Sequence, residues 1–231
     1  MRASAMRWIP LAAFLAAPAF GHIEVASGAA TSNATNEVVF SVAHGCSGND
    51  TYKVVIDIPA GVTSVRPMRS DFAIPTVVKD GSGNVTSVTW QKPDADALDA
   101  DILFYKLTLR FKTPDQALST LFFVAHQTCR AANGALSVVD WSDLPTTPAA
   151  QQTGNPAAAL RLVPARAPGW NKLTVPAAMT DLSIFFKDAL IVWKGTAAYS
   201  ANPNTAAQIA STAGVSALSA LAAGDEVWVK Y

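Results

Sequence analysis

Positive charge, cysteine and histidine are all scarce in this chain of 231 residues. Its 17 Lys and Arg are balanced by 17 Asp and Glu, and no basic cluster occurs. Nucleic acid and anionic membrane surfaces are bound through such clusters, so neither partner is expected. Beyond residue 21, no apolar run approaches the roughly 20 residues that a membrane-spanning helix needs.

Common catalytic motifs are also missing. The sequence contains no Gly-x-Ser-x-Gly, no His-Glu-x-x-His and no phosphate-binding loop, so it gives no sign of nucleophilic or zinc-protease chemistry. Four aspartates lie close together at 94, 96, 99 and 101, but their spacing is not that of an EF-hand. They predict a solvated loop.

Residues 1–21 have the pattern of a signal peptide. Arg2 and Arg7 precede the apolar stretch 8–17, and Ala-Phe-Gly at 19–21 is a typical cleavage site. Cleavage after Gly21 would remove two arginines, which leaves 15 basic against 17 acidic residues and a charge of about −2. We therefore expect a periplasmic or secreted protein that is not inserted in the membrane after cleavage.

The two cysteines, Cys46 and Cys129, predict a disulfide. Exported proteins fold in an oxidising compartment, and neither cysteine belongs to a Cys-x-x-Cys redox pair. A bridge closing so long a loop would stabilise the fold by roughly 4–5 kcal/mol in the chain-entropy model.

Alternation of apolar and polar residues dominates from residue 22 to residue 141. The clearest case is 102–111, where five apolar side chains share one face and Lys106, Thr108 and Arg110 share the other. Turn signals such as Asn133-Gly134 separate the segments. The pattern predicts a mainly β, antiparallel sandwich. The predicted strands are 36–43, 52–58, 62–66, 72–79, 85–90, 102–111, 120–126 and 135–141.

The composition changes after residue 145. Residues 146–168 are rich in Pro, Ala, Thr and Gln and predict a linker or surface strand, with one strand at 160–163. Residues 169–231 predict a small α+β unit, marginal by itself and therefore packed on the 22–145 sandwich. In this unit Asn204 is expected to cap a helix that ends near Gly214. A second helix at 216–221 and a last strand at 226–231 are expected to follow.

After cleavage His22 would be the first residue, and that position has its own chemistry. A free α-amine and the Nδ1 atom of the same histidine close a six-membered chelate on one metal ion. Copper(II) suits two such nitrogen donors and forms the most stable complexes among the divalent metals. Because the amine, with a pKa near ~8, must lose its proton to bind, acid should weaken the complex.

Seven short motifs, in order, resemble the YcnI-like copper-binding family. Residues beyond 170 also resemble the tail of a proteobacterial branch of that family, although no function is attached to that part. The motifs are HIEV at 22–25, VAHGC at 42–46, VVIDIPAGV at 54–62, RPM at 66–68, VTSVTW at 85–90, QTC at 127–129 and VVDW at 138–141.

The resemblance implies an exported bacterial protein with an immunoglobulin-like or cupredoxin-like fold. It implies that copper(II) is held by a single-histidine brace on His22, beside Trp141. The family's carboxylate ligand has no matching Glu in this chain, so Asp71 or Asp80 would replace it, and Glu24 is a further candidate. The protein would take up, buffer or deliver copper, with a copper transporter or an oxidase-assembly chaperone as partner.

Two more histidines flank the cysteine motifs. His44 continues an inward-facing row and is expected to be structural, although His44 and His126 near the disulfide would also suit a second metal site. Two other functions are considered. A copper-dependent oxidative enzyme would add a second histidine to the brace, and a metal-free adhesion or assembly module would use the sandwich alone.

Overall fold

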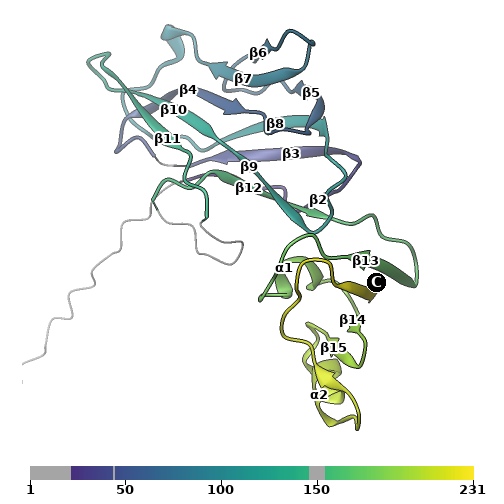
Figure 1. The fold of residues 1–231 in the computed structure, drawn as a ribbon. Helices are drawn as coiled ribbons and strands as arrows, with labels where there is room; N and C mark the ends of the chain where they lie inside the picture. The colour runs from purple at the N-terminus through teal and green to yellow at the C-terminus, as the bar shows by residue number, and fades with distance from the viewer. Residues whose placement is uncertain (1–21, 44, 146–153) are drawn as a thin grey trace, which may run out of the picture.

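The computed structural model describes residues 22–43, 45–145 and 154–231. They form a β-sandwich and a smaller second unit (Figure 1). The chain is mainly β and its sheets are mostly antiparallel, which confirms the predicted fold class. In the part of the chain described, no helix has the length and apolar character needed to cross a membrane.

Two sheets face each other across the main core. One has the order β1-β3-β8-β5 and the other β11-β10-β4-β7-β6. The first consists of β1 (Ile23–Val25), β3 (Thr35–Val42), β8 (Tyr105–Lys112) and β5 (Thr63–Pro67). The second consists of β11 (Leu136–Trp141), β10 (Ala125–Arg130), β4 (Asp50–Asp57), β7 (Val85–Gln91) and β6 (Thr76–Lys79), with the 3-10 turn η1 (Asp94–Asp96) after β7.

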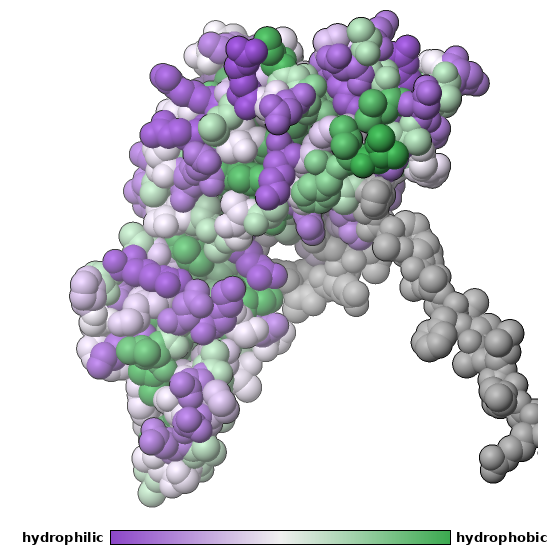
Figure 2. All heavy atoms as spheres, turned by 180° about the vertical axis from the view of Figure 1, so that it is seen from behind, coloured by the Kyte–Doolittle hydropathy of each residue, from purple (hydrophilic) through white to green (hydrophobic). Residues whose placement is uncertain are grey.

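Alternation along β8 shows why this arrangement forms. Leu107, Leu109 and Phe111 are fully buried, while Lys106 and Arg110, which alternate with them, are exposed. Each such apolar side chain contributes about 1.5–3 kcal/mol when buried. Figure 2 shows the complementary result on one face of the molecule, where polar and apolar groups are mixed and a few apolar patches stand out.

A third sheet extends the core and corrects the predicted linker. It contains β2 (Ala30–Thr31), β12 (Ala158–Val163) and β9 (Ser119–Phe123) in the order β2-β12-β9. Residues 146–168 are therefore not all a linker or surface strand, because Leu160 and Leu162 of β12 are fully buried in the sandwich core. Residues 146–153 lie outside the described part.

The second unit has its own sheet, with the order β13-β17-β14-β15-β16, and its own core. Leu118, from the loop between β8 and β9, belongs to this second core, so the unit packs on the sandwich. Its elements are β13 (Trp170–Thr174), α1 (Ser183–Phe186), β14 (Ile191–Lys194), β15 (Ala197–Tyr199), α2 (Pro203–Ser211), β16 (Ser216–Ala217) and β17 (Glu226–Lys230).

The helix predicted through residues 208–210 is confirmed as α2, but its predicted cap and the second predicted helix are wrong. Helix α2 is capped by Asn202 rather than Asn204, since the Asn202 side chain accepts hydrogen bonds from the backbone N–H groups of Asn204 and Thr205. Residues 216–221 form no helix, because β16 pairs in parallel with β15. The last strand is confirmed as β17.

Candidate metal centre

His22 lies directly before β1, at the edge of the first sheet, and its ring is half-buried. The imidazole meets the indole of Trp141 edge to face, with ring centroids 5.5 Å apart and an interplanar angle of 88°. Trp141 ends β11, the edge strand of the opposite sheet. The structure therefore brings these two predicted site residues together between the edge strands of the two sheets.

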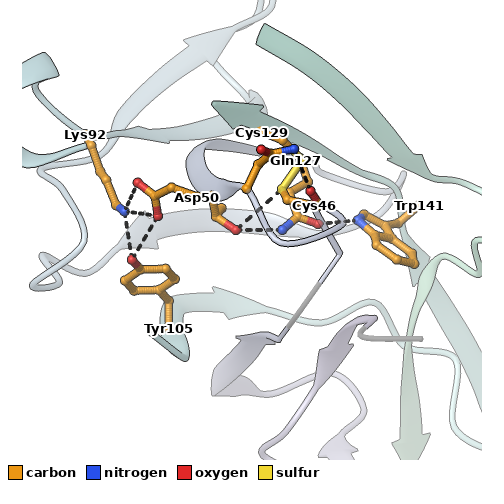
Figure 3. The surroundings of a disulfide bond; sticks show 9 residues. Cys46, Asp50, Lys92, Tyr105, Gln127, Cys129 and Trp141 are labelled. Carbon is orange, nitrogen blue, oxygen red and sulfur yellow. Dashed lines mark hydrogen bonds and ion pairs between the residues drawn. A yellow bond between two sulfur atoms is a disulfide. The ribbon is translucent and has the colours of Figure 1, made fainter. Parts of the chain in front are cut away.

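Buried polar side chains fix the position of Trp141 (Figure 3). Its Nε1–H donates a 3.0 Å hydrogen bond to Oε1 of Gln127, and Nε2 of Gln127 donates a 2.7 Å bond to Oγ1 of Thr51. Gln127 and Thr51 are each 1% exposed. Hydrogen bonds made without competing water hold an indole in one orientation, so the ring beside His22 is set by the core.

Gly45 lies close to both Gln127 and Trp141. A Cβ atom at this position would lie 2.5 Å from Oε1 of Gln127 and 2.9 Å from Cζ2 of Trp141. Both distances are shorter than van der Waals contact, so only glycine lets the loop after β3 pass this close to the indole.

The predicted disulfide is confirmed. Cys46, in the same loop, is bonded to Cys129 of β10, and their Cα atoms are 5.3 Å apart. Sγ of Cys46 also lies 3.8 Å from Oγ1 of Thr51. The bridge thus fastens the Gly45 loop to the strand that carries Gln127.

The predicted carboxylates lie in three different parts of the fold. Glu24 is exposed and accepts a 3.4 Å hydrogen bond from Ser41. Asp71 is exposed in the loop before β6. Asp80 lies after β6, which is separated from β11 by three strands, a span of about 19 Å at the usual spacing.

Asp80 has a local role in the turn that joins β6 to β7. Its carboxylate accepts hydrogen bonds from the backbone N–H groups of Ser82 and Asn84 and from the Asn84 side chain. These bonds, chiefly the one from the Asn84 side chain, lower the pKa of Asp80.

His126 lies on the outer face of β10, since its neighbours Ala125 and Gln127 are buried on the inner face. Nδ1 lies 2.6 Å from Asp140 and Nε2 lies 3.3 Å from Asp57. The hydrogen bond with Asp140 is the main cause of a raised His126 pKa, with a further contribution from Asp57 and partial opposition from burial. His126 is therefore separated from the Trp141 ring by the sheet itself. His44 lies outside the described residues.

Whether these groups suit a metal depends on the kind of site. No cluster of three or more His, Cys, Asp or Glu side chains that would hold an ion occurs in residues 22–43, 45–145 and 154–231. A chelate made by the amine and ring of one histidine needs no such cluster. His22 fits the two-nitrogen part of a brace.

Gln127, Thr51 and Gly45 were not predicted as parts of the site. One signal was available, because Gln127 occupies an inward position between Ala125 and Cys129. A polar side chain in an inward-facing row needs buried partners, which points to neighbouring polar groups.

A model of the family described as "Domain of unknown function (DUF1775)" matches residues 22–162. Among solved structures, an uncharacterized protein from Nocardia farcinica with an immunoglobulin-like fold matches with a TM-score of 0.50 and 23% identity, over 62% of this chain and 98% of that one. The major pilin subunit of Bacillus cereus matches with a TM-score of 0.35 and 8% identity, over 66% of this chain and 42% of that one. No match was found among curated proteins.

Proposed function

This chain belongs to the DUF1775 family, and we propose that it is an exported copper(II)-binding protein whose binding residue is His22. The proposal rests on a start of the mature chain at His22, which frees the backbone nitrogen that is an amide in the precursor. Copper is the cargo, which the protein acquires, buffers or delivers. The disulfide between Cys46 and Cys129 fits an exported protein.

The observation that supports the proposal best is the position of the His22 ring against Trp141. The α-amine and Nδ1 of His22 would hold the ion, and copper(II) is the divalent ion best suited to such nitrogen donors. The buried indole, fixed by Gln127, would form an apolar wall beside the ligand ring and limit the access of water. An external oxygen donor would complete the coordination.

Copper(II) titration of two forms of the protein tests this proposal. One form begins at His22 with a free α-amine and in the other that amine is acetylated, with both termini verified by intact mass. Acetylation converts the chelating amine to an amide and supplies no new amine, so we expect affinity to fall by at least about two orders of magnitude. Equal affinity of the two forms would rule out the brace.

Tryptophan fluorescence tests the location of the ion independently. Bound copper(II) quenches nearby indoles, so we expect quenching to be largely lost in Trp141→Phe and retained in Trp228→Phe. Trp228 is an exposed residue of β17 in the second unit and serves as the matched control. Quenching that persists in Trp141→Phe would place the ion elsewhere.

An oxidative enzyme built on the same chelate would need a second histidine, and His126 faces the other side of its sheet. Copper carriage needs no second histidine and is the function that we propose. Copper-dependent consumption of peroxide with formation of an oxidised product would reverse this preference.

A further inference from the structure

Three consecutive large apolar side chains are exposed directly before β8. Ile102 is 71% exposed, Leu103 48% and Phe104 60%, and we call these three residues the apolar tip. Single exposed apolar residues are ordinary on a protein surface, whereas a run of three is typical of a binding surface. The strand predicted from residue 102 begins only at Tyr105, because its partner strand β3 ends at Val42.

The segment that leads into the apolar tip is held in place. The backbone N–H of Leu98 donates a 2.9 Å hydrogen bond to the carboxylate of Asp50. The backbone N–H of Asp101 donates a 3.0 Å bond to the carbonyl of Gly48. The chain is therefore fixed to the loop after β3 immediately before the apolar residues begin.

The residue after the apolar tip is fixed as well (Figure 3). Nζ of Lys92 donates a 2.7 Å hydrogen bond to the hydroxyl of Tyr105 and pairs with the carboxylate of Asp50 at 2.6 Å. Lys92 and Asp50 are both almost fully buried. Because it is anchored on both sides, the apolar tip would lose little conformational entropy when a partner binds.

A neighbouring loop adds to this surface. Phe72 packs against the ring of Tyr105 with centroids 4.7 Å apart, and Ile74, two residues later, is 66% exposed. Apolar side chains do gather in a patch on the larger unit in Figure 2.

Negative charge borders the apolar tip. Residues 94–101 contain four aspartates, of which Asp94, Asp96 and Asp99 are exposed; Asp94 is paired with Arg130 at 3.1 Å, and no Lys or Arg occurs from residue 93 to residue 105. An apolar centre with an acidic border complements an apolar surface that carries cations. The same charge would be repelled by an anionic membrane, so the chemistry favours a protein partner over a lipid surface.

We propose that the apolar tip, with Ile74 and the acidic segment 94–101, binds a partner protein that presents apolar side chains surrounded by Lys and Arg. Strand register places this surface near His22. Ile23 pairs with Val42 and Val42 with Tyr105, so His22 and Phe104 lie one residue beyond the same row, two strand spacings or about 10 Å apart. A role of this surface in copper transfer rests on the proposed function, whereas the binding itself does not.

Binding is tested on metal-free processed protein with a fluorescent peptide of alternating leucine and lysine. We expect saturable binding that weakens with added salt, and at least ~10-fold weaker binding by Leu103→Ser/Phe104→Ser. Replacing Asp96 and Asp99 by asparagine should weaken binding several-fold and reduce its salt dependence. Thermal unfolding should be unchanged in both variants, because the altered side chains are exposed.

Trp170→Ser/Trp228→Ser is the matched control, since both residues are 49% exposed on the separate sheet of the second unit. Equal loss of binding in this control, or equal binding of a leucine–glutamate peptide, would overturn the proposal. Two other results would show that this surface binds something other than a cationic protein partner. These are binding to anionic lipid vesicles that depends on the apolar tip, and a dimer of the protein that dissociates in Leu103→Ser/Phe104→Ser. Copper affinity of that variant, measured separately, should be normal and distinguishes this test from that of the brace.

Discussion

The polar side chains on the two faces of strand β10 differ in burial and therefore in their expected contribution to stability. On the inner face Gln127 is 1% exposed and bonded to Trp141 and Thr51. On the outer face His126, the preceding residue, bridges Asp140 and Asp57 in contact with water. Burial makes each inner bond costly to break, while solvent screens the outer ones. Removing a polar side chain from the inner face should therefore lower the free energy of unfolding more than removing one from the outer face.

The largest effect is expected from the disulfide that fastens the inner face. Replacing both Cys46 and Cys129 by alanine should lower the free energy of unfolding by about 4.5 kcal/mol, because the bridge closes a loop of 83 residues. Urea unfolding with and without reductant measures this. A loss below ~1 kcal/mol would show that the unfolded chain is not constrained in this way.

Gln127→Ala should follow, with a loss of about 3 kcal/mol. It leaves the buried Nε1–H of Trp141 unpaired and the buried hydroxyl of Thr51 with only the sulfur of Cys46 as a partner, at roughly 1–3 kcal/mol each. His126→Ala, on the outer face, is the control and should cost less than ~1 kcal/mol. Equal losses in urea unfolding would contradict the difference between the faces.

Gly45→Ala should cost about 1–3 kcal/mol, because the new methyl group would displace Gln127 and Trp141. Near-ultraviolet circular dichroism should change with the indole position. Gly81→Ala is the control, since no atom lies within 4 Å of its Cβ position. An unchanged spectrum in Gly45→Ala would show that the loop moves instead of the ring.

The smallest effect concerns the outer face and depends on pH. The His126 pKa is raised in the folded state, chiefly by Asp140. Its stabilising contribution is therefore complete below the unfolded value of about 6.5 and is lost as pH rises through the folded pKa. His126→Gln should be less stable than the natural protein at pH 6, by under ~1 kcal/mol, and equally stable at pH 9. The opposite pH trend in urea unfolding would exclude this pairing.

Much of the sandwich could be predicted from alternation, because a sheet with one buried face imposes a period of two on its strands. The predicted strand 120–126 nevertheless proved to be two, since β9 ends at Phe123 and β10 begins at Ala125 in a different sheet. Alternation continues across this change. Only the partner strands determine where the chain leaves one sheet for another.

The site could be predicted only in part. His22 was predicted from its place after the cleavage site and Trp141 from the resemblance, and their contact depends on two sheet edges that are 119 residues apart in sequence. Asp80 is the opposite case. It was predicted as a possible carboxylate ligand, but it is a turn residue after β6, which lies at the far edge of the second sheet from β11. A sequence shows which side chains could bind a metal, whereas the order of the strands decides which of them lie close together.

Leu118 couples the stability of the two units. Its side chain comes from the sandwich, where its backbone N–H is bonded to Leu162, but it completes the core of residues 169–231. Deleting the second unit would expose this leucine, whose side chain is 3% exposed in the whole chain. Melting of either unit should weaken the other, so calorimetry of the whole chain is expected to show coupled rather than independent transitions.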